Sequence, residues 1–182
     1  GLTSARHDVL GHYLAEKYTE SYDHSIPEDL VYSGNHTLTE PTKVPGVDVG
    51  KLILAPTRTY LPMMVPILEN LRPKINGIIH CSGGAQTKVT HFIDKLHIIK
   101  DNMIELPPLF EMIQESSGTD WQEMYKVFNM GSRLEIYTDE KSAEEMIKIA
   151  NSFNINAQII GHVEKSDRKQ LTIKSKYGVF EY

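Results

Sequence analysis

Apolar residues recur at helical spacing in one stretch of the chain and alternate with polar residues in the stretch before it. Residues 140–153 predict an amphipathic helix capped by Thr138 or Asp139, because five apolar side chains share one face: Ala143, Met146, Ile147, Ala150 and Phe153. Residues 132–138 alternate polar and apolar positions, which is the period of a half-buried strand. A strand followed by a helix is therefore the expected local unit here.

The rest of the chain continues this alternation of short apolar runs and helical segments. Strands are expected at 75–80, 96–100 and 154–163, followed by a terminal hairpin of 171–174 with 179–182. Helices are expected at about 3–18, from near Val65 to 71, at 85–95, at 107–117 and at 120–128. The natural packing of such elements is an α+β fold in which helices flank a mixed β-sheet.

Residues 19–50 interrupt this order with a long, mostly irregular segment that is rich in proline and glycine: Pro27, Gly34, Pro41, Pro45, Gly46 and Gly50. One short strand is expected within it, at 30–32. Connections of this length are uncommon on a compact domain, so we expect the segment to cover or face a partner domain. The chain has 182 residues, the length of roughly one domain, and 1–182 is interpreted as a single domain.

Composition places the chain among ordinary globular proteins, with 40% hydrophobic and 24% charged residues. The net charge of −5 gives no basic footprint, which argues against a nucleic-acid partner. No apolar stretch approaches the roughly 20 residues that span a membrane, so no membrane partner is expected. The single cysteine, Cys81, excludes an intramolecular disulfide and indicates a reducing compartment, from which we expect a cytoplasmic location.

The junction between the strand expected at 75–80 and the following helix is the strongest local signal of a site. His80 ends the strand, and Cys81-Ser-Gly-Gly84 turns the chain. Adjacent glycines at a helix start let backbone N–H groups approach an anion such as a phosphate. The pattern is neither Gly-x-Gly-x-x-Gly nor a Walker loop, so a plain tight turn with positive φ stays open. For His80 alone, a histidine bonded within the core is the favoured interpretation.

Other residues with reactive side chains give weaker signals. Arg58, beside Thr57 and a proline-fixed turn, can clamp a phosphate or carboxylate, or it can be a surface side chain at a helix entry. The eight histidines show no His-Glu-x-x-His motif and no compact ligand spacing, so no metal site is expected. Cys81 lacks a local signature of nucleophilic catalysis and is interpreted as a small buried side chain.

Four motifs, in order along the chain, resemble one enzyme family. They are Leu54-Ala-Pro-Thr-Arg-Thr-Tyr60, Ile79-His-Cys-Ser-Gly-Gly84, Glu123-Met-Tyr-Lys-Val-Phe-Asn-Met-Gly131 and Gly161-His-Val-Glu-Lys-Ser-Asp167. Together they are similar to the C-terminal domain of aminoimidazole ribonucleotide synthetase, also called phosphoribosylformylglycinamidine cyclo-ligase. The chain departs from the family pattern at Ala85, where a third glycine is usual, at 86–92, where an Asn-x-Pro-Arg segment is absent, and at 132–134.

The resemblance implies an ATP-dependent ligase of purine biosynthesis. Such an enzyme closes the imidazole ring of formylglycinamidine ribonucleotide to give aminoimidazole ribonucleotide. The resemblance also implies a catalytic His80 and a group that binds substrate and phosphate: Thr57, Arg58, Ser82, Gly83, Gly84, Asn129 and Gly131. ATP and Mg²⁺ are the implied cofactors, bound mainly by an N-terminal domain of the family that is absent here, so the chain alone is expected to be inactive.

The partners implied by the resemblance are a small ribonucleotide substrate, the N-terminal domain of the parent chain and, at full length, a second copy in a homodimer. Two other interpretations stay open. The chain can be the C-terminal domain of another ATP-using relative, such as an amidotransferase-type synthetase, a selenophosphate synthetase or a thiamine-phosphate kinase. It can also be a non-catalytic binding or dimerising module on the same fold. The Glu123-Met-Tyr motif favours the cyclo-ligase over the other ATP-using relatives.

Overall fold

The computed structural model describes residues 2–182, which form two compact units. One unit contains residues 2–56 and 106–124, and the other contains Thr57–Glu105 and Tyr125–Tyr182. The interpretation of 1–182 as a single domain stays a prediction. Helices and a mixed β-sheet occur together, so the predicted α+β class is confirmed.

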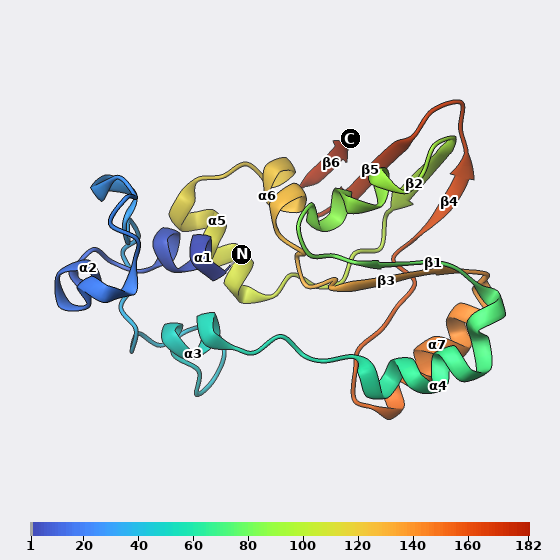
Figure 1. Cartoon of the computed structure of the whole chain (residues 1–182), viewed down its shortest axis with the longest axis horizontal. Helices are drawn as coiled ribbons and strands as arrows, with labels where there is room; N and C mark the ends of the chain where they lie inside the picture. The colour runs from blue at the N-terminus through green and yellow to red at the C-terminus, as the bar shows by residue number, and fades with distance from the viewer. Residues whose placement is uncertain (1) are drawn as a thin grey trace. The chain divides into compact units, whose positions relative to one another are not determined.

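The first unit is built from helices and turns. Its elements are α1 (Leu2–Val9), α2 (Tyr13–Lys17), η1 (Thr19–Ser21), η2 (Glu28–Leu30), α3 (Val49–Leu54), α5 (Pro108–Ser117) and the first residues of α6 (Trp121–Val127) (Figure 1). Helix α1 packs against α3 and α5, and the core between them contains the buried side chains of Val9, Val49 and Ile113. Gly118 ends α5 with a φ of +68°, as the position of this glycine predicts.

The prediction of one continuous helix over 3–18 is wrong, because the chain is not helical between α1, which ends at Val9, and α2, which begins at Tyr13. Leu10 and Gly11 form parallel bridges with His36 and Gly34, respectively. A Cβ at Gly34 would lie 2.1 Å from a backbone oxygen of α1, so only glycine permits this close approach. Pairing with residues far along the chain therefore divides one expected helix into α1 and α2.

The segment 19–50 is mostly irregular, as its proline and glycine content predicts. The short strand expected at 30–32 is wrong. Residues 28–30 form the turn η2, and Tyr32 has a φ of +48°, which a strand does not allow. The Tyr32 side chain is nevertheless buried, and its hydroxyl lies 2.7 Å from Ser21 Oγ.

The second unit combines helices with two sheets. Its elements are α4 (Leu61–Leu71), η3 (Arg72–Lys74), β1 (Ile75–His80), η4 (Ala85–His91), β2 (Leu96–Lys100), β3 (Leu134–Thr138), α7 (Glu140–Ser152), β4 (Gly161–Lys165), β5 (Gln170–Ser175), β6 (Gly178–Glu181) and the end of α6. Strands β1 and β3 pair antiparallel, and Figure 1 shows them side by side. The second sheet has the order β4-β2-β5-β6.

Strand β2 makes the four-stranded sheet mixed. It pairs antiparallel with β4, where Ile98 lies opposite Val163, and parallel with β5, where Ile98 lies opposite Leu171. Strands β5 and β6 form the predicted terminal hairpin. Helix α7 begins after Asp139, whose carboxylate accepts a hydrogen bond from the Ser142 amide at 3.0 Å, as predicted for a cap.

Helices α4 and α7 pack together on one hydrophobic cluster, formed by Met63, Ile67, Leu71, Met146 and Ala150. Helix α4 begins at Leu61 rather than near Val65, because Pro62 occupies the first turn, where no backbone donor is needed. The strand expected at 154–163 begins only at Gly161, since Asn154 has a φ of +54° and reverses the chain after α7.

The helix predicted at 85–95 is instead the short 3₁₀ helix η4, which ends at His91. Gly84 and Ala85 both have positive φ, +85° and +41°, so the chain enters this segment through a tight turn rather than through α-helical geometry. This turn follows β1 directly and forms part of the predicted site.

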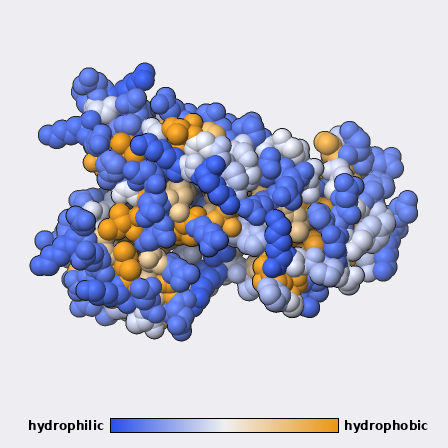
Figure 2. Space-filling model, turned by 180° about the vertical axis from the view of Figure 1, so that it is seen from behind, coloured by the Kyte–Doolittle hydropathy of each residue, from blue (hydrophilic) through white to orange (hydrophobic). Residues whose placement is uncertain are grey.

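Hydrophobic side chains also reach the surface of the molecule. Figure 2 shows them as separate groups among hydrophilic residues on the face that it draws. Leu54, Leu61, Phe92 and Val179 are the most exposed large hydrophobic residues. No helix within residues 2–182 is both long enough and apolar enough to cross a membrane.

Candidate functional site

The site predicted at the end of β1 begins with an exposed histidine. His80 pairs with Leu134 of β3 through the backbone, and its imidazole has no hydrogen-bond partner among residues 2–182. The interpretation of His80 as a histidine bonded within the core is therefore wrong. The next residue, Cys81, continues the pairing through its amide, which donates to the Arg133 carbonyl at 2.8 Å.

The chain then reverses within four residues. The Ser82 amide donates to the His80 carbonyl at 2.8 Å, and the Ala85 amide donates to the Ser82 carbonyl at 2.7 Å. Gly84 has the positive φ that glycine adopts without strain, so the expected tight turn is present. Ser82 and Gly83 are exposed, and nothing lies within 4 Å of a Cβ built at Gly83. The turn thus presents His80 and Ser82 side chains beside bare backbone.

A second turn, at 129–132, lies against the first. Met130 and Gly131 have φ values of +52° and +94°, and the Asn129 side chain accepts a hydrogen bond from the Gly131 amide at 2.9 Å. Gln86 Nε2 donates to the carbonyls of Asn129 (2.6 Å) and Ser132 (3.1 Å). The structure therefore brings the residues predicted at 80–84 and at 129–131 together.

A buried ion pair supports both turns from within the second unit. Lys100, the last residue of β2, places Nζ 2.5 Å from Glu135 Oε1 of β3. The same ammonium donates to the backbone carbonyl of Gln86 (2.8 Å) and to its side-chain oxygen (3.0 Å). All three donors of the lysine are used, which is the condition for a stable buried charge. Lys100, Gln86 and Glu135 thus link two strands to both turns.

The carboxylate of Glu135 also holds two neighbouring side chains in their neutral forms. Its Oε2 accepts from the Tyr137 hydroxyl at 2.8 Å, and its Oε1 accepts from Cys81 Sγ at 3.4 Å. Burial, together with the negative charge of Glu135, raises the pKa of Cys81 to about 12 and raises the pKa of Tyr137 as well. Cys81 is therefore a buried thiol and not a nucleophile, as its sequence context predicts.

Arg58 is held by residues outside the two turns. Arg58 is exposed, and its two terminal nitrogens donate to the carbonyls of Phe153 and Asn154, each at 2.8 Å. These carbonyls follow α7, so the guanidinium satisfies acceptors left at the end of that helix. Thr57 is exposed beside it. Arg58 keeps three further N–H donors for a ligand.

Four residues that shape the site are not among those predicted from the sequence: Gln86, Lys88, Lys100 and Glu135. Lys88 Nζ donates to Ser82 Oγ at 2.7 Å, and the other three form the buried network. A lysine at the end of the apolar run 96–100 is one available signal, since a charge in that position needs a buried partner. Glu135 alternates with Leu134 and Ile136, and this pattern predicts an exposed side chain rather than a buried one.

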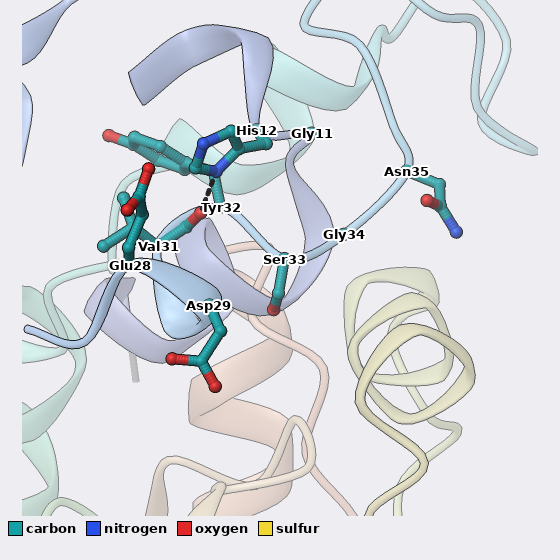
Figure 3. A pocket seen from close by; sticks show the side chains of 9 residues that line it. All are labelled: Gly11, His12, Glu28, Asp29, Val31, Tyr32, Ser33, Gly34 and Asn35. Atoms are coloured by element: carbon teal, nitrogen blue, oxygen red, sulfur yellow. Dashed lines mark hydrogen bonds between the residues drawn. The ribbon is translucent and has the colours of Figure 1, made fainter. Parts of the chain in front are cut away.

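A separate cavity of about 910 Å³ lies in the first unit (Figure 3). Its wall includes Glu28 and Asp29 near His12, whose Nδ1 donates to the Val31 carbonyl at 2.9 Å. None of the residues predicted for the site lines this cavity. Two carboxylates in the wall disfavour a phosphate there, so the turns after β1 and before β3 remain the candidate anion site.

Comparison with known proteins agrees with the motifs. A family model described as "AIR synthase related protein, C-terminal domain" matches residues 30–174. A relative named phosphoribosylformylglycinamidine cyclo-ligase, from Methanocaldococcus jannaschii, is 39% identical over 66% of this chain and 35% of its own length. A second protein of that name, from Syntrophus aciditrophicus, is 30% identical over 91% of this chain and 48% of its own. The chain thus spans half or less of these relatives.

Among solved structures, the hydrogenase maturation protein HypE of E. coli matches 66% of this chain and 38% of its own, with 18% identity and a TM-score of 0.47. This likeness is too weak to support a functional statement. The family match covers most of the chain and includes both turns of the candidate site. The chain therefore belongs to the family of AIR synthase related proteins and contains their C-terminal domain.

Proposed function

We propose that this chain is the substrate-side domain of an ATP-dependent cyclo-ligase in purine biosynthesis. The substrate is formylglycinamidine ribonucleotide, and the product is aminoimidazole ribonucleotide. The hydrogen bonds from Gln86, which directly follows the first turn, to the second turn support the proposal, because they hold the turn at 80–84 close to the turn at 129–132. The names of the relatives, both cyclo-ligases, supply the reaction.

In this reaction the γ-phosphoryl group of ATP is transferred to the formamide-derived oxygen as ADP leaves, and the oxygen becomes part of a phosphate leaving group. A nitrogen of the amidine side then attacks the activated carbon, the C–N bond forms, and the C–O bond to phosphate breaks. The domain's task is to position the reacting atoms and neutralise phosphate charge, which are the main sources of rate in phosphoryl chemistry.

Each outward group of the two turns has a role in this proposal. The Gly83 and Gly84 amides and the Ser82 hydroxyl receive phosphate oxygens, and His80 orients a substrate amide or carries a proton near neutral pH. The Asn129 side-chain amide and the Gly131 backbone also contact the substrate, as the resemblance implies. Thr57 and Arg58 belong to the separate segment before α4, and the resemblance alone adds them to the site, with the unused donors of Arg58 binding the phosphate.

The chemistry of these groups suits an anion better than a cation. Among the residues that the structure describes, no three His, Cys, Asp or Glu side chains are arranged to hold a metal ion. Glu135, the carboxylate that accepts a hydrogen bond from Cys81 beside the turn, is buried and already paired with Lys100. We therefore assign Mg²⁺ and most ATP contacts to the N-terminal domain of the family. Full-length chains, each with both domains, would pair as a homodimer.

The backbone conformation of Ala85, which stands where the family has a glycine, weighs against a non-catalytic module. Ala85 adopts a φ of +41°, so the backbone keeps the left-handed conformation that a glycine favours at this position. An alanine in this conformation is strained, and such strain persists at sites where the surrounding structure requires it. The turn thus has positive φ at position 85 although alanine stands where the family has glycine.

The test is turnover by the full-length polypeptide that contains this chain, here called the encoded polypeptide. It is supplied with formylglycinamidine ribonucleotide, ATP and Mg²⁺. Aminoimidazole ribonucleotide should form, and His80→Asn should lower kcat/KM by roughly 100-fold or more. His162→Asn, a change at an exposed histidine on β4, serves as the matched control and should leave kcat/KM unchanged. The absence of turnover in the folded wild-type protein would refute the proposal, and the 182-residue chain alone should be inactive.

A further inference from the structure

Lys88 is fixed above the turn that carries Ser82 and Gly83. Its Nζ donates to Ser82 Oγ at 2.7 Å, and its side chain is partly buried. The stem of the lysine begins directly against Gly84, since a Cβ at that glycine would lie 3.5 Å from both Cα and Cβ of Lys88. The ammonium is therefore held at one defined place rather than moving freely in solvent.

This ammonium has no negatively charged partner. Among residues 2–182, no carboxylate lies within ion-pair distance of Lys88, whereas Lys43, Lys51 and Lys100 each pair with one. A lysine ammonium has three N–H donors, and the Ser82 hydroxyl accepts from one of them. Two donors and a full positive charge remain available for a ligand.

The hydroxyl that positions Lys88 is itself able to donate. Ser82 Oγ accepts from Lys88, and its own hydrogen has one partner, the His80 carbonyl, at the long distance of 3.4 Å. A ligand oxygen can replace that weak contact with a shorter hydrogen bond. Lys88 and Ser82 thus form a pair of donors with one net positive charge, placed beside a glycine that offers no steric hindrance.

We infer that Lys88 binds the phosphate of the substrate, with Ser82 as its partner, and that the ligand is a phosphate monoester dianion such as the 5′-phosphate of a ribonucleotide. The inference rests on the proposed function for the identity of the substrate, but not for the binding of phosphate. Charge-assisted hydrogen bonds from lysine to phosphate are strong and short, and the dianion has enough oxygens for both donors.

The difference from Arg58 supports this assignment. The terminal nitrogens of Arg58 are engaged with the carbonyls of Phe153 and Asn154, whereas the Lys88 ammonium is engaged with a single hydroxyl. Lys88 also lies in η4, directly after the turn that contains Ser82, Gly83 and Gly84, and its ammonium donates to Ser82 of that turn. The Lys88 ammonium is therefore the more accessible of the two cations to a phosphate.

The experiment measures phosphate binding to the 182-residue chain by NMR or calorimetric titration. The probes are ribose 5-phosphate, inorganic phosphate and ATP, each at low ionic strength because salt screens such contacts. Ribose 5-phosphate should bind, and Lys88→Gln should weaken that binding roughly 10- to 100-fold, the range of a hydrogen bond to a charged group. Lys88→Arg should restore most of it, and Lys95→Gln, a change at an exposed lysine, should have no effect.

The probes and variants separate the possible outcomes. A monoester site prefers ribose 5-phosphate, whereas stronger binding of inorganic phosphate or ATP would assign Lys88 to the transferred group and overturn the inference. Failure of the wild-type chain to bind ribose 5-phosphate, or equal binding by Lys88→Gln with an unchanged unfolding temperature, would also overturn it. Loss of binding in Lys88→Gln without turnover in the encoded polypeptide would leave the phosphate site standing and refute the proposed function.

Discussion

Lys100 Nζ and Glu135 Oε1 lie 2.5 Å apart although their strands, β2 and β3, belong to different sheets. The two side chains are 2% and 4% exposed. Removing one member of such a pair leaves an unpaired buried charge. We expect Glu135→Gln or Lys100→Met to lower the free energy of unfolding by about 3–5 kcal/mol, measured by urea denaturation.

The control for this prediction is the exposed pair of Lys51 and Asp48, in which Lys51→Met should cost about 1 kcal/mol or less. The double variant Lys100→Met with Glu135→Leu should lose less unfolding free energy than the two single variants lose in sum, because neither charge is left unpaired. Additive losses, or a loss below about 1 kcal/mol in the single variants, would show that the pair is not a coupled unit.

The stability of the first unit should depend on pH through His7. Burial, with the positive charge of Arg6, lowers the pKa of His7 below its ordinary 6.5, and its Nδ1 accepts a hydrogen bond from the Tyr32 amide at 3.2 Å. The unfolded chain then binds the proton more readily than the folded one, so stability is full above pH 6.5 and falls as the pH drops below it.

The loss should not exceed about 1.4 kcal/mol per pH unit for this one group, as measured by urea denaturation between pH 7.5 and 5. His7→Gln should flatten the dependence. The carboxyls of Asp48 and Asp139 do not contribute in this range, because hydrogen bonds from the amides of Lys51 and Ser142 lower their pKa values. An unchanged slope in the His7 variant would assign the effect to another group.

Arg58 should affect both stability and activity. Arg58→Ala removes two hydrogen bonds to the carbonyls after α7, and we expect a loss of about 1 kcal/mol in unfolding free energy because the side chain is exposed. In the encoded polypeptide it should also weaken transition-state binding by about 1.5–3 kcal/mol, measured as kcat/KM.

Arg72→Ala is the matched control, since Arg72 is an exposed arginine at the end of α4, and it should change neither quantity. A stability loss in Arg58→Ala with kcat/KM within about twofold of wild type would give Arg58 the structural role alone. Lys at this position keeps the charge but not the fork, so it should restore activity better than stability.

Two glycines of the second unit should lose very different amounts of stability when replaced by alanine. A Cβ at Gly161 would lie 1.9 Å from the Ile99 carbonyl oxygen across the β2–β4 pair, whereas a Cβ at Gly83 meets nothing within 4 Å. Gly161→Ala should therefore lower the unfolding free energy by about 3 kcal/mol or more, through displacement of paired strands. Gly83→Ala should cost less than about 1 kcal/mol, and thermal unfolding followed by circular dichroism distinguishes the two.

Regular elements with strong local signals could be predicted from the sequence. Helix α7 has both an apolar stripe and a capping Asp139, and three of the five residues of strand β2 are apolar, so each signal lies within or directly beside the element itself. The division of the 3–18 helix could not be predicted, because it depends on bridges from Leu10 and Gly11 to residues beyond 30. Local periodicity contains no information about such distant partners.

The candidate site shows the same division. The turn after His80 could be predicted, because adjacent glycines directly after a strand indicate a tight turn. Glu135 could not, since alternation assigns it to a solvent face, and only the approach of β2 with Lys100 makes that position buried. Lys88 lies in the segment that departs from the family pattern, so neither the motif nor the spacing indicated it.

Gln86 is fully buried, directly follows the turn at 80–84 and is bonded to the turn at 129–132, whereas Ser82 and Gly83 are exposed and Lys88 is bonded to Ser82. Mutations at the outward positions can therefore accumulate without moving the backbone, whereas a change at position 86 disturbs both turns at once. Proteins that contain this domain can therefore diverge in ligand preference through positions 82, 83 and 88 while they keep the buried network around Gln86. New specificities can arise in this way without a new fold.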